Sequence, residues 1–586
     1  MAQPSRLILL AAMCLLCSAP ARANIEIELR GLEEAEIRAN VLVYLSLERY
    51  RTRDELNPDL LDRLHNRVER EVRAALKPFG YYEPKVGSKL ERLRGGDWRV
   101  TVDIEPGKPV VVQEVTISVQ GPGAEDPLFA TILANPPLRR GERLSHAAYE
   151  KVKNDLQRTA ATYGYLEARM LHNELKVDPE RHTASAVLEL ETGERYRFGA
   201  THIEQEAIDE RLIRRFIRYR ENEPFDLTQL LRTQFALDDS QYFSTVEVLP
   251  GEADRATRVV PVSIRAAVNR RFRYSFGLGY GTDTQERGTA TWEDRRINTR
   301  GHRFSVELEA ARLAQSLRGR YVIPIGDPAL EKLTFEVTAE QRELADLDTE
   351  NFDFEPSITQ VHGRWQQVWF VTATHTTTEL GLERDTDILL IPGVNLASVP
   401  QGYLGEALFS RGFFAELRGS HSAFGSDEDF LQLRVQAERA FDLNSRWHLL
   451  LRGDVGASLV AEFSDLPGSV RFFAGGDRSV RGFGYNDLSP VLDEDDDPLT
   501  PAIKVGGKHL LTGTVELVRN LPRNLGIAVF ADAGNAFDTF GDPLEYSAGL
   551  GVRWRLPVVT VGIDVAQPLS EPDAGPRLHV NFSPKL

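Results

Sequence analysis

The stretch Val559-Thr560-Val561-Gly562-Ile563-Asp564-Val565-Ala566 shows the pattern that decides the fold of the C-terminal half. Branched apolar side chains occupy every second position, and small or polar side chains occupy the positions between them. Successive side chains of a β-strand point to opposite faces, so this strand has one apolar and one polar face. A strand that separates lipid from a polar lumen needs this arrangement.

The same pattern extends outward over the region from about Val268 to Leu586. Short alternating segments are separated by turn residues, with no long helical periodicity. A soluble β-sandwich would show the same period, but about 320 residues of strand pattern exceed a usual sandwich domain. At roughly 20 residues per strand and loop, the length predicts about 16 strands. We therefore expect a transmembrane antiparallel β-barrel over residues 267–586.

An internal repeat precedes this region. Ile104-Glu105-Pro106-Gly107 and Leu190-Glu191-Thr192-Gly193 align without gaps, and in each copy an alternating strand runs into the glycine turn. Upstream, helical segments end at Gly80 and Gly164, each followed by tyrosine. Glycine directly after a helix supplies the left-handed conformation that ends it.

A third, weaker copy has a helical segment from about Asp226 and a strand from Val260 to Ile264, without the glycine. The repeats therefore predict three α+β domains, at residues 24–107, 108–193 and 194–266. The helix ends resemble those of polypeptide-transport-associated (POTRA) domains, whose order is a strand, two helices and two strands.

The first 23 residues predict export from the cytoplasm. Arg6, an apolar stretch from Leu7 to Cys17 and the end Ala21-Arg22-Ala23 are typical of a signal peptide cleaved before Asn24. Because Cys14 and Cys17 are the chain's only cysteines, the mature protein has no thiol for disulfides or metal.

Composition excludes several further classes of protein. After the signal peptide the sequence contains no run of 18 apolar residues, so it predicts no ordinary transmembrane helix. A membrane-spanning part must therefore be a barrel. The net charge of −17 argues against nucleic acid as a partner, although simple solubility explains it equally well. Metal, phosphate-loop and hydrolase motifs are absent, so we expect neither an enzyme nor a cofactor.

The most specific segment reads Phe472-Phe473-Ala474-Gly475-Gly476-Asp477-Arg478-Ser479-Val480-Arg481-Gly482-Phe483-Gly484-Tyr485. It resembles the superfamily of barrel-assembly proteins that includes BamA and TamA. In that family an Arg-Gly-Phe motif lies at the tip of a long extracellular loop folded into the barrel lumen. The resemblance implies this position for Arg481, Gly482 and Phe483.

An arginine in the lumen needs acidic partners, because an unpaired charge away from bulk water is costly. The alternation of residues 511–517 and 526–534 turns Glu516 and Asp532 inward. We infer that Arg481 bridges both carboxylates and holds the loop as a latch. An ordinary lumen ion pair is the alternative. Phe530 and Gly534 support the assignment, because Phe530-Ala531-Asp532-Ala533-Gly534 resembles the family's Phe-x-Asp-x-Gly motif.

The first barrel strand places Gly277, Gly279 and Gly281 on one face, and the last strand, from Arg577 to about Ser583, points Phe582 outward. Glycine weakens a strand, and the first and last strands must pair to close a barrel. These strands could form a lateral seam. Packing of lumen-facing glycines against the inserted loop explains them equally well.

Three N-terminal domains are typical of TamA-like members of the superfamily. That resemblance implies an outer-membrane location with the N-terminal domains in the periplasm, contact with outer-membrane lipids, and assembly of autotransporters and other outer-membrane proteins. It implies two kinds of partner: unfolded clients, and a TamB-like protein that is anchored in the inner membrane and spans the periplasm. A channel or lipid-transport conduit and a secretion transporter for one passenger remain alternatives. For the acidic run Asp493–Asp497 we expect a solvated loop, with divalent-cation contact as the alternative.

Overall fold

The computed structural model describes residues 25–51, 57–93, 97–283, 285–380, 383–398, 412–492, 503–556 and 559–584. The predicted signal peptide and the acidic run 493–497 lie outside these residues. The chain forms two compact units, which we describe separately. The first contains residues up to Thr201 with 219–230 and 250–262, and the second contains the remainder with the barrel. No helix in the described ranges is both long and apolar enough to span a membrane.

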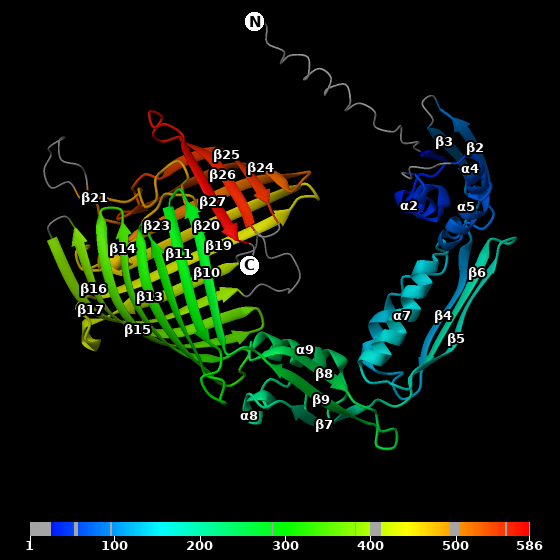
Figure 1. Cartoon of the computed structure of the whole chain (residues 1–586), viewed down its shortest axis with the longest axis horizontal. Coiled ribbons are helices and arrows are strands. Elements are labelled where there is room, and N and C mark those ends of the chain that lie inside the picture. The colour runs from blue at the N-terminus through cyan, green and yellow to red at the C-terminus, as the bar shows by residue number, and fades with distance from the viewer. Residues whose placement is uncertain are drawn as a thin grey trace, which may run out of the picture. The chain divides into compact units, whose positions relative to one another are not determined.

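Three small sheets follow one another in the N-terminal part that the structure describes (Figure 1). Their strand orders are β1-β3-β2, β4-β6-β5 and β7-β9-β8. In the first two, the central strand pairs parallel with the first strand and antiparallel with the other. The elements are β1 Ile25–Arg30, α2 Ala35–Tyr44, α3 Ser46–Arg49, α4 Pro58–His65, α5 Val68–Leu76, β2 Lys85–Arg92, β3 Trp98–Glu105, β4 Val111–Gln120, α6 Pro127–Ala134, α7 His146–Thr162, β5 Arg169–Asp178, β6 Thr183–Glu191, β7 Arg197–Glu204, α8 Glu210–Arg214, α9 Leu227–Asp239, β8 Phe243–Pro250 and β9 Val259–Val268.

The core of each module lies between its sheet and its helices. In the first module every second residue of β3, from Val100 to Ile104, is at most 3% exposed. The facing residues Val68, Val72 and Leu76 recur every four positions on one side of α5 and are fully buried. The expected order of three POTRA-type modules and a barrel is confirmed. Their boundaries at residues 107, 193 and 266 stay predictions.

The glycines that end the helices also form the joints between modules. Gly80 and Gly164 have φ angles of 84° and 88°, in the left-handed region. The carbonyl of Gly80 accepts a hydrogen bond from the Val110 amide, and that of Gly164 accepts one from the Tyr196 amide, both at 2.8 Å. A Cβ atom at Gly164 would lie 2.9 Å from Cβ of Phe225. Each joint is therefore a direct backbone contact with no room for a side chain.

A cation and a tyrosine support each joint. Arg143 donates to Glu34 at 2.5 and 2.8 Å and lies 5.4 Å from the ring centre of Tyr81. Arg195 donates to Asp126 at 3.2 Å and lies 5.8 Å from the ring centre of Tyr165. Burial and the hydrogen bond to Asp126 raise the pKa of Tyr165 to about 12, so its hydroxyl remains a donor.

Sixteen strands within the described residues close into an antiparallel barrel, which confirms the predicted number (Figure 1). The long connection between β20 and β23 contains the 3₁₀ turn η3 Gly468–Val470 and the short hairpin β21 Val491–Leu492 with β22 Ile503–Lys504. The barrel strands are β10 Phe272–Gly281, β11 Gln285–Asp294, β12 Arg303–Ala311, β13 Ala314–Pro324, β14 Lys332–Leu344, β15 Leu347–His362, β16 Trp365–Leu380, β17 Glu383–Ser398, β18 Phe413–Ser420, β19 Phe430–Asp442, β20 Trp447–Val460, β23 His509–Leu521, β24 Leu525–Phe537, β25 Glu545–Arg555, β26 Val559–Pro568 and β27 Arg577–Pro584.

The strand alternation divides the barrel wall into a lipid face and a lumen face. On β24, Ile527 and Val529 are 45% and 53% exposed, whereas Phe530 and Asp532 are each 3% exposed. On β26, Ile563 and Val565 are exposed and Asp564 is buried. Apolar side chains of these two strands therefore point outward, and Asp532 and Asp564 point into the lumen.

We predict that Gly164→Ala loosens its joint more than Gly141→Ala changes the protein. Both glycines have similar positive φ angles, but a Cβ atom at Gly141 would meet nothing within 4 Å. Backbone strain is thus common to both variants, at about 1–3 kcal/mol, and only Gly164→Ala adds a steric clash. Hydrogen exchange of the Tyr196 amide in the full chain should accelerate in Gly164→Ala and stay unchanged in Gly141→Ala. Equal exchange in the two variants would contradict this account.

Candidate functional site

The long connection between β20 and β23 packs into the barrel lumen. Phe472, Val480 and Phe483 of this lumen loop are each at most 6% exposed and cluster with Leu510 of β23. At Gly482 a Cβ atom would lie 2.6 Å from Cβ of Ser547 and 2.9 Å from Cα of Pro568. Only glycine allows the loop to approach the wall this closely.

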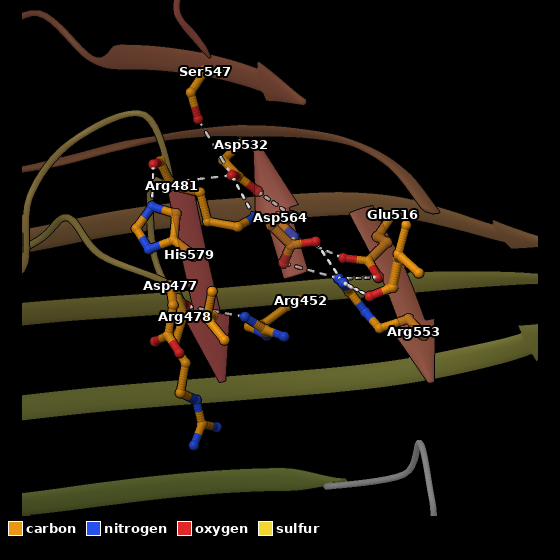
Figure 2. A network of polar contacts seen from close by, with 12 residues as sticks. Arg452, Asp477, Arg478, Arg481, Glu516, Asp532, Ser547, Arg553, Asp564 and His579 are labelled. Atoms are coloured by element: carbon orange, nitrogen blue, oxygen red, sulfur yellow. Dashed lines mark hydrogen bonds and ion pairs between the residues drawn. The ribbon is translucent and has the colours of Figure 1, made fainter. Parts of the chain in front are cut away.

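Arg481 points from the loop toward three strands of the wall (Figure 2). Its Nε and Nη2 donate to the two carboxylate oxygens of Asp532 at 2.9 and 2.8 Å, and its Nη1 donates to Glu516 at 2.8 Å. The Arg481 amide also donates to Asp532, at 3.2 Å. Its side chain is 4% exposed, so these bonds form away from bulk water. The structure thus brings together the three residues that the sequence pointed to.

The motif residues Phe530 and Gly534 lie beside this contact on β24. The Arg481 guanidinium carbon lies 3.3 Å from the ring centre of Phe530, so the cation also faces an aromatic ring. A Cβ atom at Gly534 would lie 2.4 Å from the carbonyl oxygen of Leu511 on the neighbouring strand. The glycine therefore keeps β23 and β24 close where they carry the two acidic partners.

A second arginine, which the sequence analysis missed, completes the network (Figure 2). Arg553 of β25 donates to Glu516 at 3.0 Å and to Asp564 at 2.5 and 3.0 Å. Asp564 in turn lies 3.5 Å from Arg481. The alternation of the stretch 559–566 predicts that Asp564 points inward, so a search for inward-facing charged residues in the sequence could have found Asp564.

The charges of this network determine what it can do. Two guanidinium groups face three carboxylates, all largely buried. Such a group of charges is stable only as a whole, because removal of one partner leaves a buried charge uncompensated. It fixes the loop tip against β23, β24 and β26. Its function as a latch remains a prediction.

The barrel closes only weakly between its first and last strands. β10 pairs with β11 at ten positions, but among the described residues it pairs with β27 only at Gly281 and Asn581. Phe276 and Leu278 of β10 are 83% and 96% exposed, more than the outward side chains of β24, because they face the small residues Ala290 and Gly288 on β11 and β27 does not pair beside them. Within the part of the chain that the structure describes, the backbone N–H and C=O groups along the rest of this edge of β10 have no partner strand.

The predicted seam residues lie at this weak closure. Gly277, Gly279 and Gly281 share the lumen face of β10, opposite the exposed side chains. A Cβ atom at Gly277 would lie 2.5 Å from the Thr289 hydroxyl, and one at Gly279 would lie 2.6 Å from Nε of Arg287. Phe582 lies in β27 opposite Val561, but its side chain lies outside the described residues.

Contacts within the second unit attach residues near the third module's helices to turns of the barrel. The Tyr242 hydroxyl donates to the carbonyl of Gly301 at 2.6 Å, and the Asp209 amide donates to that of Thr299 at 2.8 Å. Arg218 pairs with Asp327 in a third contact. Burial raises the pKa of Tyr242, so its hydroxyl keeps the proton that it donates.

Comparisons with known proteins match both ends of the chain. Residues 407–583 match the Omp85 superfamily domain, and residues 26–106 match the POTRA domain described as TamA domain 1. The outer membrane protein assembly factor BamA of Nitratidesulfovibrio vulgaris is 31% identical over 156 residues, 25% of this chain and 19% of that protein. BamA of Neisseria meningitidis is 26% identical over 197 residues, 28% of this chain and 24% of that protein. The chain thus spans about a quarter or less of these relatives.

A solved structure shares the fold. The crystal structure of BamA from Haemophilus ducreyi lacking POTRA domains 1–3 aligns with a TM-score of 0.63 at 16% identity. The alignment covers 81% of this chain and 99% of that chain. At this identity the likeness supports the architecture of the modules and barrel alone.

We predict that Arg481→Ala strongly destabilises the barrel and releases the lumen loop. Asp532 would remain buried without a cation and Glu516 would keep only Arg553, at a cost of about 3–5 kcal/mol. Urea-induced unfolding and protease cleavage within residues 461–508 would measure both effects. Arg312→Ala is the control, because Arg312 is an exposed arginine of the turn between β12 and β13 and its loss should cost about 0.5 kcal/mol or less. Similar results for the two variants would exclude a special contribution of Arg481.

Proposed function

Because the chain belongs to the superfamily of barrel-assembly proteins that includes BamA and TamA, we propose that it assembles other proteins into the outer membrane. Its barrel lies in the outer membrane and its N-terminal modules lie in the periplasm. The expectation that it is not an enzyme is confirmed by this family, whose named relatives are assembly factors.

The weakly paired seam is the observation that carries the proposal. Along most of β10, the N–H and C=O groups that would pair with β27 have no partner strand among the described residues. Unpaired groups of this kind are costly inside a bilayer, and an incoming strand satisfies them. A client strand that pairs with β10 could enter the membrane already hydrogen-bonded. The Gly281–Asn581 pair and the hydrogen bonds between Thr282 and Val580 beside it present little resistance to such exchange.

The lumen loop favours a lateral route over an axial one. Its buried cluster and the Arg481 network occupy the interior beside β23, β24 and β26. A channel or lipid conduit would need this loop to leave the lumen. A steady large conductance in planar bilayers would favour that alternative, and a mostly closed barrel supports assembly at the seam.

The clients and partner that we propose are more specific. The TamA-type first POTRA domain supports autotransporters as clients and a TamB-like inner-membrane-anchored protein as partner. The modules offer edge strands for transient pairing, since β2, β5 and β8 each lie at the border of a three-stranded sheet. A transporter for one dedicated passenger would differ by assembling one client and no other.

We predict that a disulfide across the seam blocks client assembly. Gly281→Cys with Asn581→Cys joins the register partners, and the cysteine-free sequence after residue 23 provides no competing thiol. Assembly of an autotransporter client, measured by its surface exposure, should stop with the pair oxidised and recover after reduction. Gly453→Cys with Gly513→Cys is the matched control, because it links β20 and β23, which are already paired along their length.

The outcomes separate the alternatives. Full assembly with the seam oxidised would exclude the lateral route and favour a scaffold or conduit. Loss of assembly in the β20–β23 control as well would mean that the disulfides harm the barrel in general. Loss in the seam variant alone, reversed by reduction, supports insertion at the seam.

A further inference from the structure

The paired end of the seam carries a second polar cluster, centred on His579 of β27. Nε2 of His579 lies 2.6 Å from the backbone oxygen of Arg481 in the lumen loop (Figure 2). Nδ1 lies 3.2 Å from a carboxylate oxygen of Asp283, in the turn after β10. The imidazole is 3% exposed. One side chain therefore connects the last strand, the end of the first strand and the lumen loop.

Hydrogen-bond chemistry determines the protonation state that makes both contacts. A carbonyl oxygen only accepts, so Nε2 must carry a proton to bond Arg481. An ionised carboxylate also only accepts, so Nδ1 must carry a proton to bond Asp283. An imidazole that donates from both nitrogens is an imidazolium cation. A neutral ring can keep only one of the two contacts.

Acidic residues lie around His579. The backbone amide of Asp477 donates to the Asp283 carboxylate, which places a second acidic residue beside the ring. Asp564 is the register partner of His579 on β26 and shares its lumen face. The charged groups that face this cluster from the turn after β10, the lumen loop, β26 and β25 are Asp283, Asp477, Arg478, Arg481, Asp564 and Arg553. Arg481 and Arg553 already bind three carboxylates, and Asp283 and Asp477 lie beside the ring in addition to these.

We propose that the His579 imidazolium is a proton-dependent clasp that couples the lumen loop to closure of the seam. This inference rests on the proposed function only for its biological meaning, since the contacts themselves need no client. The clasp is complete while the ring is doubly protonated, at lower pH, and is lost as the pH rises through its ionisation. Without it, the closure of the barrel loses its links to the lumen loop and to Asp283, and keeps the Gly281–Asn581 pair with the hydrogen bonds between Thr282 and Val580.

The coupling acts in both directions. Withdrawal of the loop removes the Arg481 carbonyl from Nε2, and separation of β10 from β27 removes Asp283 from Nδ1. A seam opened by a client therefore weakens the hold on the loop, and a released loop weakens the seam. His579 is a positioning residue in this scheme, because it touches the two moving parts and not the client.

Distance measurements across the seam test the clasp directly. Spin labels at Leu278→Cys and Leu578→Cys occupy lipid-exposed positions on β10 and β27. In phospholipid nanodiscs without client, double electron–electron resonance should give a narrow distance distribution at about pH 5 and a longer, broader one at about pH 8. We expect a shift of at least one strand spacing, about 5 Å.

Three variants identify the group responsible. His579→Gln can donate a hydrogen bond but carries no charge, so it should give the open distribution at both pH values. Asp283→Asn removes one acceptor charge and should shift the transition to lower pH. His375→Gln, at an exposed histidine of the distant strand β16, should keep the normal response. Circular dichroism checks that each barrel is folded.

A wild-type distribution that does not change with pH would overturn the clasp, as would a His579→Gln variant that responds like the wild type. These results are separable from the proposed function. Client assembly by a protein whose seam ignores pH would overturn the clasp and keep the function. A pH-responsive seam in a protein that assembles no client would keep the clasp and overturn the function.

Discussion

Burial of the Arg481 charge is the constraint on which the interior of the barrel depends. A guanidinium in a lumen that is shielded from water must meet carboxylates, and here it meets them on three separate strands. That requirement fixes the loop tip, and the loop tip in turn explains Gly482, whose missing side chain allows the approach to β25 and the end of β26. The lumen is therefore organised around one cation.

The same loop connects to the closure of the barrel. Its backbone at Arg481 receives the His579 hydrogen bond, and its amide at Asp477 donates to Asp283 beside the first strand. The best-anchored segment of the lumen thus contacts the least well-paired part of the wall. The lumen loop therefore connects the buried Arg481 network to the seam, where the structure describes one residue pair between β10 and β27.

The sequence predicted the fold well because barrel strands and repeated modules have short-range signatures. Period-two alternation in residues 559–566 requires no knowledge of neighbouring strands, and the glycine turns of the repeats mark each module locally. Glu516 and Asp532 could be placed inward by the same alternation. Arg553, Asp283 and His579 could not be assigned to the network, because their partners are chosen by strand register and by the path of a loop of nearly fifty residues.

The glycine joints between the modules have a consequence for how such chains diversify. The backbone amides of Val110 and Tyr196 donate hydrogen bonds to glycine carbonyls. These contacts use backbone atoms only, so they do not depend on the side chains of Val110 and Tyr196. A module that ends in glycine and begins with a free amide carries both halves of the connection. Duplication or loss of a whole module would leave a matching joint behind. Arrays of different lengths can then arise in one step, without simultaneous change on both sides of a new interface.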